Sequence, residues 1–172
     1  ISIKSIFESC LNLSSIKLNS NLNTPNLINM EKMFYDCQNL VNIDDIFNLF
    51  NTSKVTNMSH TFYGCFNLKK LNLCFDNLDT SNVVDMSKMF FKCKNLYKID
   101  LNKKFNTKNV KNMNQMFAYC TNLIKLDFGV LNIENVGNMA EMFYFCTNLQ
   151  QINLRKSSIK NVNNMNKMFN NC

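Results

Sequence analysis

Cysteine is the residue of this chain with the widest chemistry, because a thiolate can bind a metal, form a disulfide or act as a nucleophile. Seven of the eight cysteines recur at intervals of 26 to 28 residues along the 172-residue chain: Cys10, Cys37, Cys65, Cys93, Cys120, Cys146 and Cys172. Zinc sites usually contain ligand pairs at short spacing such as C-x-x-C, and no such pair occurs. One thiol per interval, beside apolar residues, predicts free cysteines that fill a core and no metal site. Disulfides between adjacent intervals are the alternative. Cys74 lies outside the series and is the thiol that we expect to be reactive.

Acid–base and phosphate chemistry have little support. The chain has one histidine, His60, and only 12 acidic residues. No glycine-rich phosphate loop and no G-x-S-x-G nucleophile motif is present. We therefore expect a protein that is not an enzyme and that has no cofactor.

The elements that position the cysteines repeat with them. A phenylalanine stands three residues before each cysteine of the series, and a leucine stands three residues after all but the last. All 11 methionines fall in two columns, seven or four residues before the cysteine. One repeat reads approximately V-x-N-M-x-x-M-F-x-x-C-x-N-L-x-x-I-x-L. Self-similarity at this period is the signature of a solenoid.

The two halves of the repeat have different periods. Met30, Met33, Phe34 and Cys37 have the i, i+3, i+4, i+7 spacing of a short helix, and Asn29 before them is a favoured N-cap. The second half reads L-x-x-[IL]-x-[LF], as at Leu68–Leu73, which is the strand pattern of leucine-rich repeats. We predict an α/β repeat solenoid of leucine-rich-repeat-like, right-handed coils. A parallel β-sheet would form one face and short helices the other.

The segment Asn82–Leu101, N-V-V-D-M-S-K-M-F-F-K-C-K-N-L-Y-K-I-D-L, resembles the BspA-like leucine-rich repeats. It is most similar to the subgroup whose repeats read S-N-V-T-N-M-S-x-M-F-x-x-C-x-x-L. The resemblance covers the chain from about Ser5 to Cys172. It implies a bacterial or protist surface protein, often involved in adhesion to host or matrix proteins, and it brings no catalytic residue with it.

The whole chain, residues 1–172, is predicted to be a single solenoid of about six repeats of 26–28 residues. Both ends lie inside a repeat, so we expect either a longer array or end-to-end contact with another subunit. No apolar run is long enough to span a membrane. The resemblance implies the cell surface or an extracellular location. The chain shows no signal peptide, which leaves an intracellular or assembly-bound protein as the alternative.

Two surfaces are candidates for binding a protein partner. Outward positions of the predicted strands form a column of lysines beside a column of aspartates, and the residue after the core phenylalanine is aromatic in several repeats. The candidate residues are Lys70, Lys98, Asp100, Lys125 and Asp127 on the strands, and Tyr35, Tyr63 and Phe91 beside the core. The lysines and aspartates could instead neutralise each other, and the rings could instead cover gaps between coils.

Charge favours an acidic partner, because the formal net charge is +7. Nucleic acid is a minor alternative, since the basic residues are scattered and no aromatic residues alternate with them on the predicted sheet face. Two functions follow. The first is a non-catalytic protein-binding or adhesion module of a surface protein. The second is an architectural subunit whose coils dock end to end or against other proteins.

Overall fold

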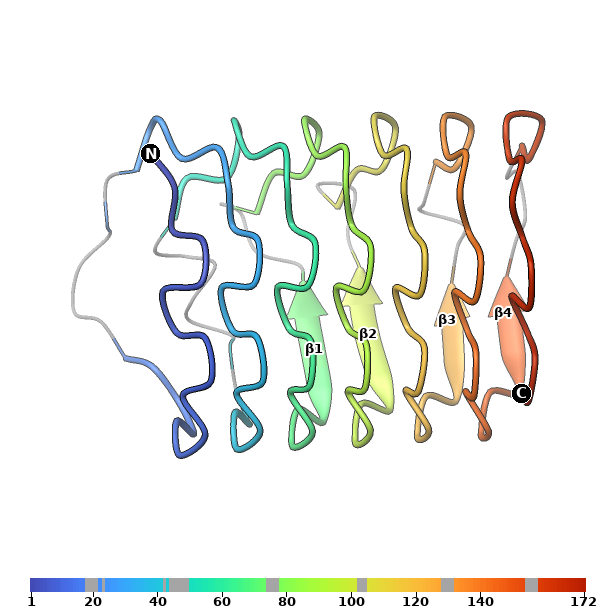
Figure 1. The fold of residues 1–172 in the computed structure, drawn as a ribbon, viewed down its shortest axis with the longest axis horizontal. Helices are drawn as coiled ribbons and strands as arrows, with labels where there is room; N and C mark the ends of the chain where they lie inside the picture. Colours follow the sequence, from blue (N-terminus) through green and yellow to red (C-terminus); the bar gives the residue numbers. More distant parts are fainter. Residues whose placement is uncertain are drawn as a thin grey trace.

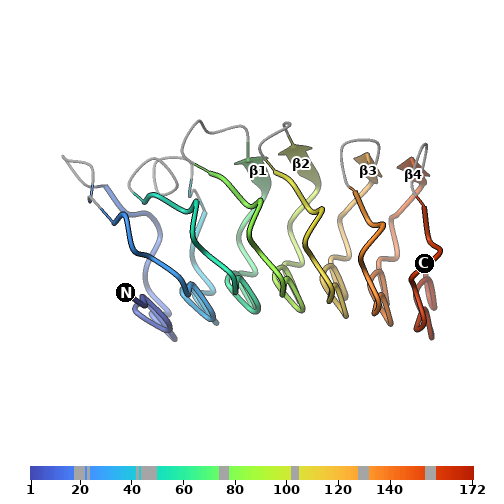
Figure 2. The ribbon, with the colours of Figure 1, turned by 90° about the horizontal axis from the view of Figure 1, so that it is seen from above.

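The computed structural model of the chain describes residues 1–17, 22, 24–41, 43, 50–73, 78–101, 105–127, 132–153 and 158–172. Successive coils stack along one axis, with the two termini at opposite ends of the stack (Figure 1). Viewed from above, the strands lie on one face and a wall of turns lies on the opposite face (Figure 2). Within the described residues no helix is long and apolar enough to cross a membrane.

The strands lie where the L-x-x-[IL]-x-[LF] pattern placed them. They are β1 (Lys70–Leu73), β2 (Lys98–Leu101), β3 (Lys125–Asp127) and β4 (Gln151–Asn153). β1 pairs in parallel with β2, and β3 pairs in parallel with β4. Leu71 and Leu126 face the core at 0% and 3% exposure. The strand residues Lys70, Lys98 and Lys125 are exposed to solvent. The prediction of parallel strands is confirmed.

The prediction of short helices is wrong, because no described residue lies in a helix. The segment that starts at Met30 is a series of tight turns. In it, Met33 N–H donates to the Met30 carbonyl at 3.2 Å, and Cys37 N–H donates to the Phe34 carbonyl at 3.2 Å. Alternate N–H groups reach the next coil: Met30 donates to the Asn57 carbonyl at 3.0 Å, and Phe34 donates to the Thr61 carbonyl at 2.9 Å. The segment has the wrong backbone partners for a helix.

Turns replace the helix because hydrogen bonds to the neighbouring coil take the place of hydrogen bonds within a short helix. Two turns of isolated helix are not stable, because the costly nucleus is followed by too few hydrogen bonds. Stacked coils offer each second N–H a carbonyl in the neighbouring coil instead. Reaching it requires one residue in four to adopt a positive φ, as Lys32 (56°) and Asp36 (57°) do. The i, i+3, i+4, i+7 spacing still places the apolar side chains inside, so the two structures share one sequence pattern.

Gly64 occupies the second of these positive-φ positions, with φ at 71°. A Cβ atom there would lie 2.8 Å from Asp36 Oδ1 of the preceding coil. Glycine therefore relieves both the backbone strain and a close contact at this point.

The core is a ladder of stacked rings. Phe34 and Phe62 lie 5.6 Å apart between ring centroids, and Phe62 and Phe90 lie 5.6 Å apart, with interplanar angles of 6° and 4°. The same contact links Phe90 to Phe117 at 5.4 Å. The methionine columns pack beside these rings and are buried, apart from Met165 in the last coil. Each coil thus buries its apolar side chains only with its neighbours, as a solenoid requires.

Asparagine connects the coils at the surface. Asn67 donates its side-chain amide to Asn39 Oδ1 at 2.9 Å, and Asn95 donates to Asn67 Oδ1 at 3.3 Å. Asn122 continues the ladder to Asn95 at 3.4 Å. This column therefore stacks coil on coil. The expected caps are also present, because Asn29 Oδ1 accepts a hydrogen bond from Glu31 N–H at 2.8 Å, although it caps a turn and not a helix.

Candidate functional site

The strand face presents Lys70, Lys98 and Lys125 to solvent. Lys70 stands opposite Lys98 in the parallel register of β1 and β2, and Asn72 stands opposite Asp100. The side chains of Asp100 and Asp127 lie outside the part of the chain that the structure describes. The structure thus places the predicted lysines on one exposed face and leaves the predicted lysine–aspartate pairing as a prediction.

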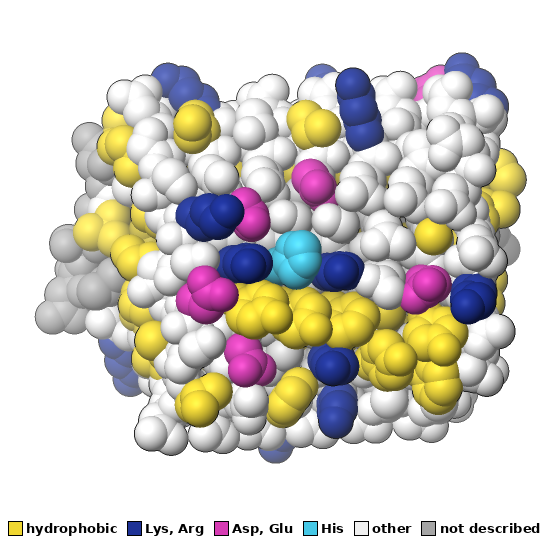
Figure 3. All heavy atoms as spheres, viewed as in Figure 1, with side chains coloured by type: hydrophobic (Ala, Val, Ile, Leu, Met, Phe, Trp, Pro, Cys, Tyr) yellow, Lys and Arg dark blue, Asp and Glu magenta, His cyan; other side chains and the backbone are white. Residues whose placement is uncertain are grey.

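The aromatic candidates form a continuous row on the turn face. Tyr35 stacks on Tyr63 with 4.5 Å between ring centroids, and Tyr63 stacks on Phe91 at 4.7 Å. The interplanar angles are 9° and 10°. Tyr35 and Tyr63 are partly exposed, whereas Phe91 is buried at 8% exposure. We call these three residues the aromatic row; Figure 3 shows the turn face on which it lies.

The row continues through residues that we did not predict. Tyr119 meets Phe91 edge to face at 5.4 Å, and it stacks on Phe145 at 5.3 Å. Tyr119 and Phe145 stand two residues after the core phenylalanine, not one, so the column shifts by one position at Ala118. The aromatic residues at these positions are visible in the sequence. Only the fold shows that they adjoin the column of rings that stand one residue after the core phenylalanine.

Lysines flank the row, although the repeat pattern of the sequence did not indicate them. Lys32 Nζ lies 5.3 Å from the centroid of Tyr35, and Lys92 Nζ lies 5.5 Å from the centroid of Phe91. Lys94 Nζ lies 5.0 Å from the centroid of Phe66. These are cation–π distances. Lysines lie on both sides of the hydrophobic stripe on the turn face (Figure 3).

His60 lies beside the aromatic row. Its ring is 5.9 Å from Tyr63 and 6.4 Å from Tyr35, and its Nδ1 is buried without a hydrogen-bond partner in the described structure. Burial lowers the pKa of His60, and the nearby cations Lys88 and Lys32 lower it further. Glu31 and Asp85 oppose this shift more weakly. Burial and the neighbouring Tyr35 raise the pKa of Tyr63.

The five inner cysteines of the column, from Cys37 to Cys146, are buried. Cys93 donates its thiol to the Phe62 carbonyl of the preceding coil at 3.1 Å, and Cys65 and Cys120 repeat this contact. Burial raises the pKa of Cys37 to about 11 and that of Cys146 to about 12. The thiolate is therefore scarce at neutral pH. The described cysteines are all free, as predicted, with Cys10 and Cys172 exposed. Cys74 lies outside the described residues.

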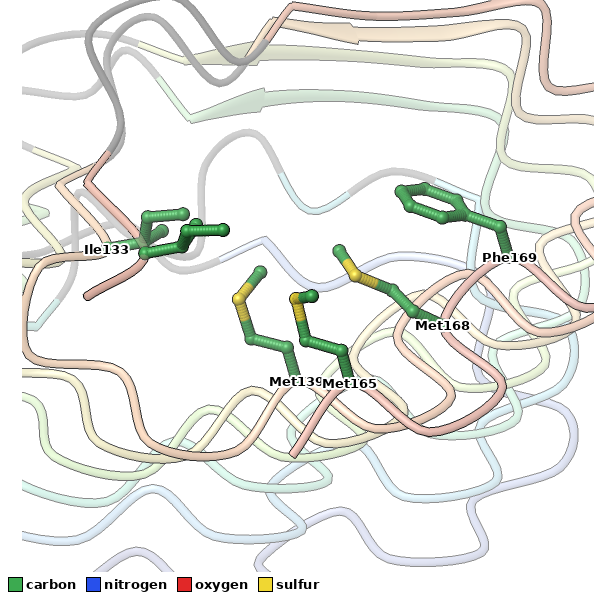
Figure 4. Close-up of a pocket in the computed structure, with 6 residues that line it drawn as sticks. Ile133, Met139, Met165, Met168 and Phe169 are labelled. Carbon is green, nitrogen blue, oxygen red and sulfur yellow. The ribbon is translucent and has the colours of Figure 1, made fainter. Parts of the chain in front are cut away.

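No cluster of three or more histidine, cysteine, aspartate or glutamate side chains that could hold a metal is present among the described residues. A cavity of about 260 Å³ opens at the C-terminal coil (Figure 4). The described residues that line it are all apolar: Ile133, Met139, Ile159, Met165, Met168 and Phe169. These described side chains are of the kind that fill the core between coils.

Comparisons with known proteins identify a family. The family model described as "Mycoplasma protein of unknown function, DUF285" matches residues 1–98 and 65–172. A comparison with curated proteins found no match. Among solved structures, the chain is similar to a leucine-rich repeat protein from Bacteroides ovatus, with a TM-score of 0.48 and 18% identity. The similarity covers 88% of this chain and 40% of that one, so this chain spans less than half of the solved protein.

Proposed function

The chain belongs to the DUF285 family, and we propose that it is a non-catalytic protein-binding module whose partner contacts the aromatic row on the turn face. The observation that carries the proposal is the stack of Tyr35, Tyr63 and Phe91, in which two rings remain partly exposed. Aromatic side chains offer a large contact area with little loss of conformational entropy, and they are enriched where proteins bind each other.

The rigidity of the row supports the proposal. Each ring is attached to a turn whose N–H groups are bonded to the next coil, such as Asp36 N–H to the Tyr63 carbonyl at 2.6 Å. Each turn is also anchored by the core phenylalanine directly before the ring. A surface that is ordered before binding loses less entropy when the partner arrives. The row therefore has the organisation of a binding surface.

The strand face is the other candidate within the same function. Lys70, Lys98 and Lys125 form an exposed basic strip there, and the repeat can vary such positions without changing the fold. Exposed lysines alone contribute little binding energy, because solvent screens them and their side chains lose entropy on contact. We therefore place the main contact on the turn face and use the strand face as the comparison in the test.

The resemblance to BspA-like surface proteins supports adhesion as the biological role and a surface or extracellular location, and we propose both. The subgroup assignment rests on repeat motifs such as that at Asn82–Leu101.

Affinity capture with quantitative mass spectrometry tests the function. Four proteins are compared: the native chain, a Tyr35→Ala/Tyr63→Ala variant, a Lys98→Glu/Lys125→Glu variant, and a Tyr97→Ala control. Tyr97 is 44% exposed and lies just before β2, away from the row.

We expect a protein that is captured by the native chain and by the control but is lost with the tyrosine pair. Loss with the lysine pair alone would move the site to the strand face. If no captured protein depends on either pair, the binding-module proposal fails. Circular dichroism confirms that each variant is folded.

An architectural role is the second candidate, and one observation favours it. Met165 and Phe169 of the C-terminal coil are each 47% exposed and line the apolar cavity. Such a face can accept a further coil or a docking protein. Substituting both residues with glutamine should then lower the assembly size in analytical ultracentrifugation, an outcome that the first proposal does not predict.

A further inference from the structure

Resting on the proposed function, we propose that the segment bound at the aromatic row is acidic, and that it contacts the lysines around Phe91. These are Lys88, Lys92 and Lys94, which we call the lysine triad. All three belong to one coil, and none of them forms an ion pair among the described residues. Lys92 Nζ lies 5.5 Å from the ring centroid of Phe91 and Lys94 Nζ lies 5.0 Å from that of Phe66, so the triad sets positive charge against aromatic rings of the turn face.

The nearby acidic groups offset the charge of the triad only in part. Glu31 is paired with Lys4 at 3.0 Å, in another coil. Asp85 has Oδ1 engaged by Ser87 N–H at 2.8 Å, as the cap of its turn. Asp36 has Oδ1 engaged by the Gln38 side chain at 3.2 Å, two coils away. These hydrogen bonds leave the charges of Asp85 and Asp36 in place, but Glu31 is offset by Lys4 and Asp36 lies two coils away, so positive charge predominates at the triad.

The orientation of the rings adds to this selectivity. Tyr63 stacks on Tyr35 on one side and on Phe91 on the other, so the faces of its ring are covered. The exposed part of a stacked ring is its edge, where the hydrogen atoms carry partial positive charge. Carboxylates favour such edges more than cations do. The ring edges of the aromatic row and the lysine triad thus both favour a negatively charged partner.

The covered ring faces also argue against single-stranded nucleic acid. Binding without base pairing relies on bases that stack on open aromatic faces. The stacks of Tyr35 on Tyr63 and of Tyr63 on Phe91, with interplanar angles of 9° and 10°, leave no space for a base between these rings. An acidic protein segment, which can place carboxylates on lysines and apolar groups on ring edges, fits the surface better.

Fluorescence anisotropy with defined probes tests the proposal. The probe is a labelled 16-residue peptide of mixed glutamate and tyrosine, compared with a peptide in which each glutamate is glutamine. The variant is Lys88→Gln/Lys92→Gln/Lys94→Gln. Its matched control, Lys54→Gln/Lys69→Gln/Lys108→Gln, removes the same charge from three exposed positions elsewhere. We expect the glutamate peptide to bind the native chain on the order of tenfold more tightly than the triad variant at low salt, with the control close to native.

Each outcome separates the two proposals. Equal binding of the glutamate and glutamine peptides, no binding of either, or equal loss in the variant and the control, would overturn the acidic-partner proposal. The function itself would survive if Tyr35→Ala/Tyr63→Ala still removed the captured protein. A single-stranded oligonucleotide that bound more tightly than the glutamate peptide, and through the same lysines, would assign the surface to nucleic acid and overturn this proposal.

Discussion

Replacing Phe90 with alanine tests whether the ring ladder holds the coils together. Phe90 is fully buried and stacks on Phe62 at 5.6 Å and on Phe117 at 5.4 Å. Removing a buried phenylalanine costs about 3–5 kcal/mol, because transfer energy is lost and a cavity remains. The neighbouring rings are anchored by their own turns, which limits collapse into the space. We therefore expect a loss of about 4–5 kcal/mol in the free energy of unfolding.

Phe169 provides the matched control. It stacks on one ring, Phe143, at 5.6 Å, and it is 47% exposed. Its replacement by alanine should cost about 1–2 kcal/mol, because half of the ring already contacts water. Phe90→Leu, which retains most of the volume, should also cost about 1–2 kcal/mol and keeps the comparison usable if Phe90→Ala does not fold.

Urea unfolding followed by circular dichroism at 25 °C measures these differences, provided that the denaturant slopes of the variants agree. If Phe169→Ala destabilises as much as Phe90→Ala, the ladder is not the principal core. A cost below about 1.5 kcal/mol for Phe90→Ala would show that the coils are held mainly by backbone bonds.

Cys93→Ser should cost about 1–2 kcal/mol, since the shorter C–O bond leaves the hydroxyl farther than the thiol from the Phe62 carbonyl, which the sulfur reaches at 3.1 Å. A thiol reagent should label exposed Cys10 and Cys172 in the native protein but Cys93 only after unfolding; rapid labelling of Cys93 would contradict its burial. For His60, the folded-state pKa lies below the ordinary 6.5, so the unfolded chain binds the proton more tightly. Stability should therefore fall as the pH drops below about 6.5, and His60→Asn, which tolerates the positive φ, should lose part of that dependence of Tm between pH 7.5 and pH 5. Deleting one whole repeat, Val83–Asn109, should leave a folded protein of lower Tm, because each coil contacts only its neighbours; complete loss of the circular dichroism signal would argue against a solenoid.

Much of the fold could be predicted from spacing alone. The L-x-x-[IL]-x-[LF] pattern located the strands that begin at Lys70 and Lys98. Side chains of a strand point alternately to its two faces, so only one orientation of each strand turns Leu71 and Ile99 toward the core. The recurring phenylalanine identified the core, since a residue repeated at a fixed interval occupies the same place in each coil. The absence of paired cysteine spacings likewise indicated free thiols.

The turn wall and the aromatic row depended on tertiary structure. Met30, Met33, Phe34 and Cys37 satisfy the helical spacing, and nothing in their order reveals that Met30 N–H bonds to the next coil instead of within its own. That choice depends on an acceptor about 27 residues away in the chain, which exists only once the coils have stacked. The same holds for Tyr119 beside Phe91 and for the lysine triad. Local sequence determines which side chains each coil turns inward, but the partners of its backbone groups and surface rings are decided by the adjacent coil, because only stacking brings them within bonding distance.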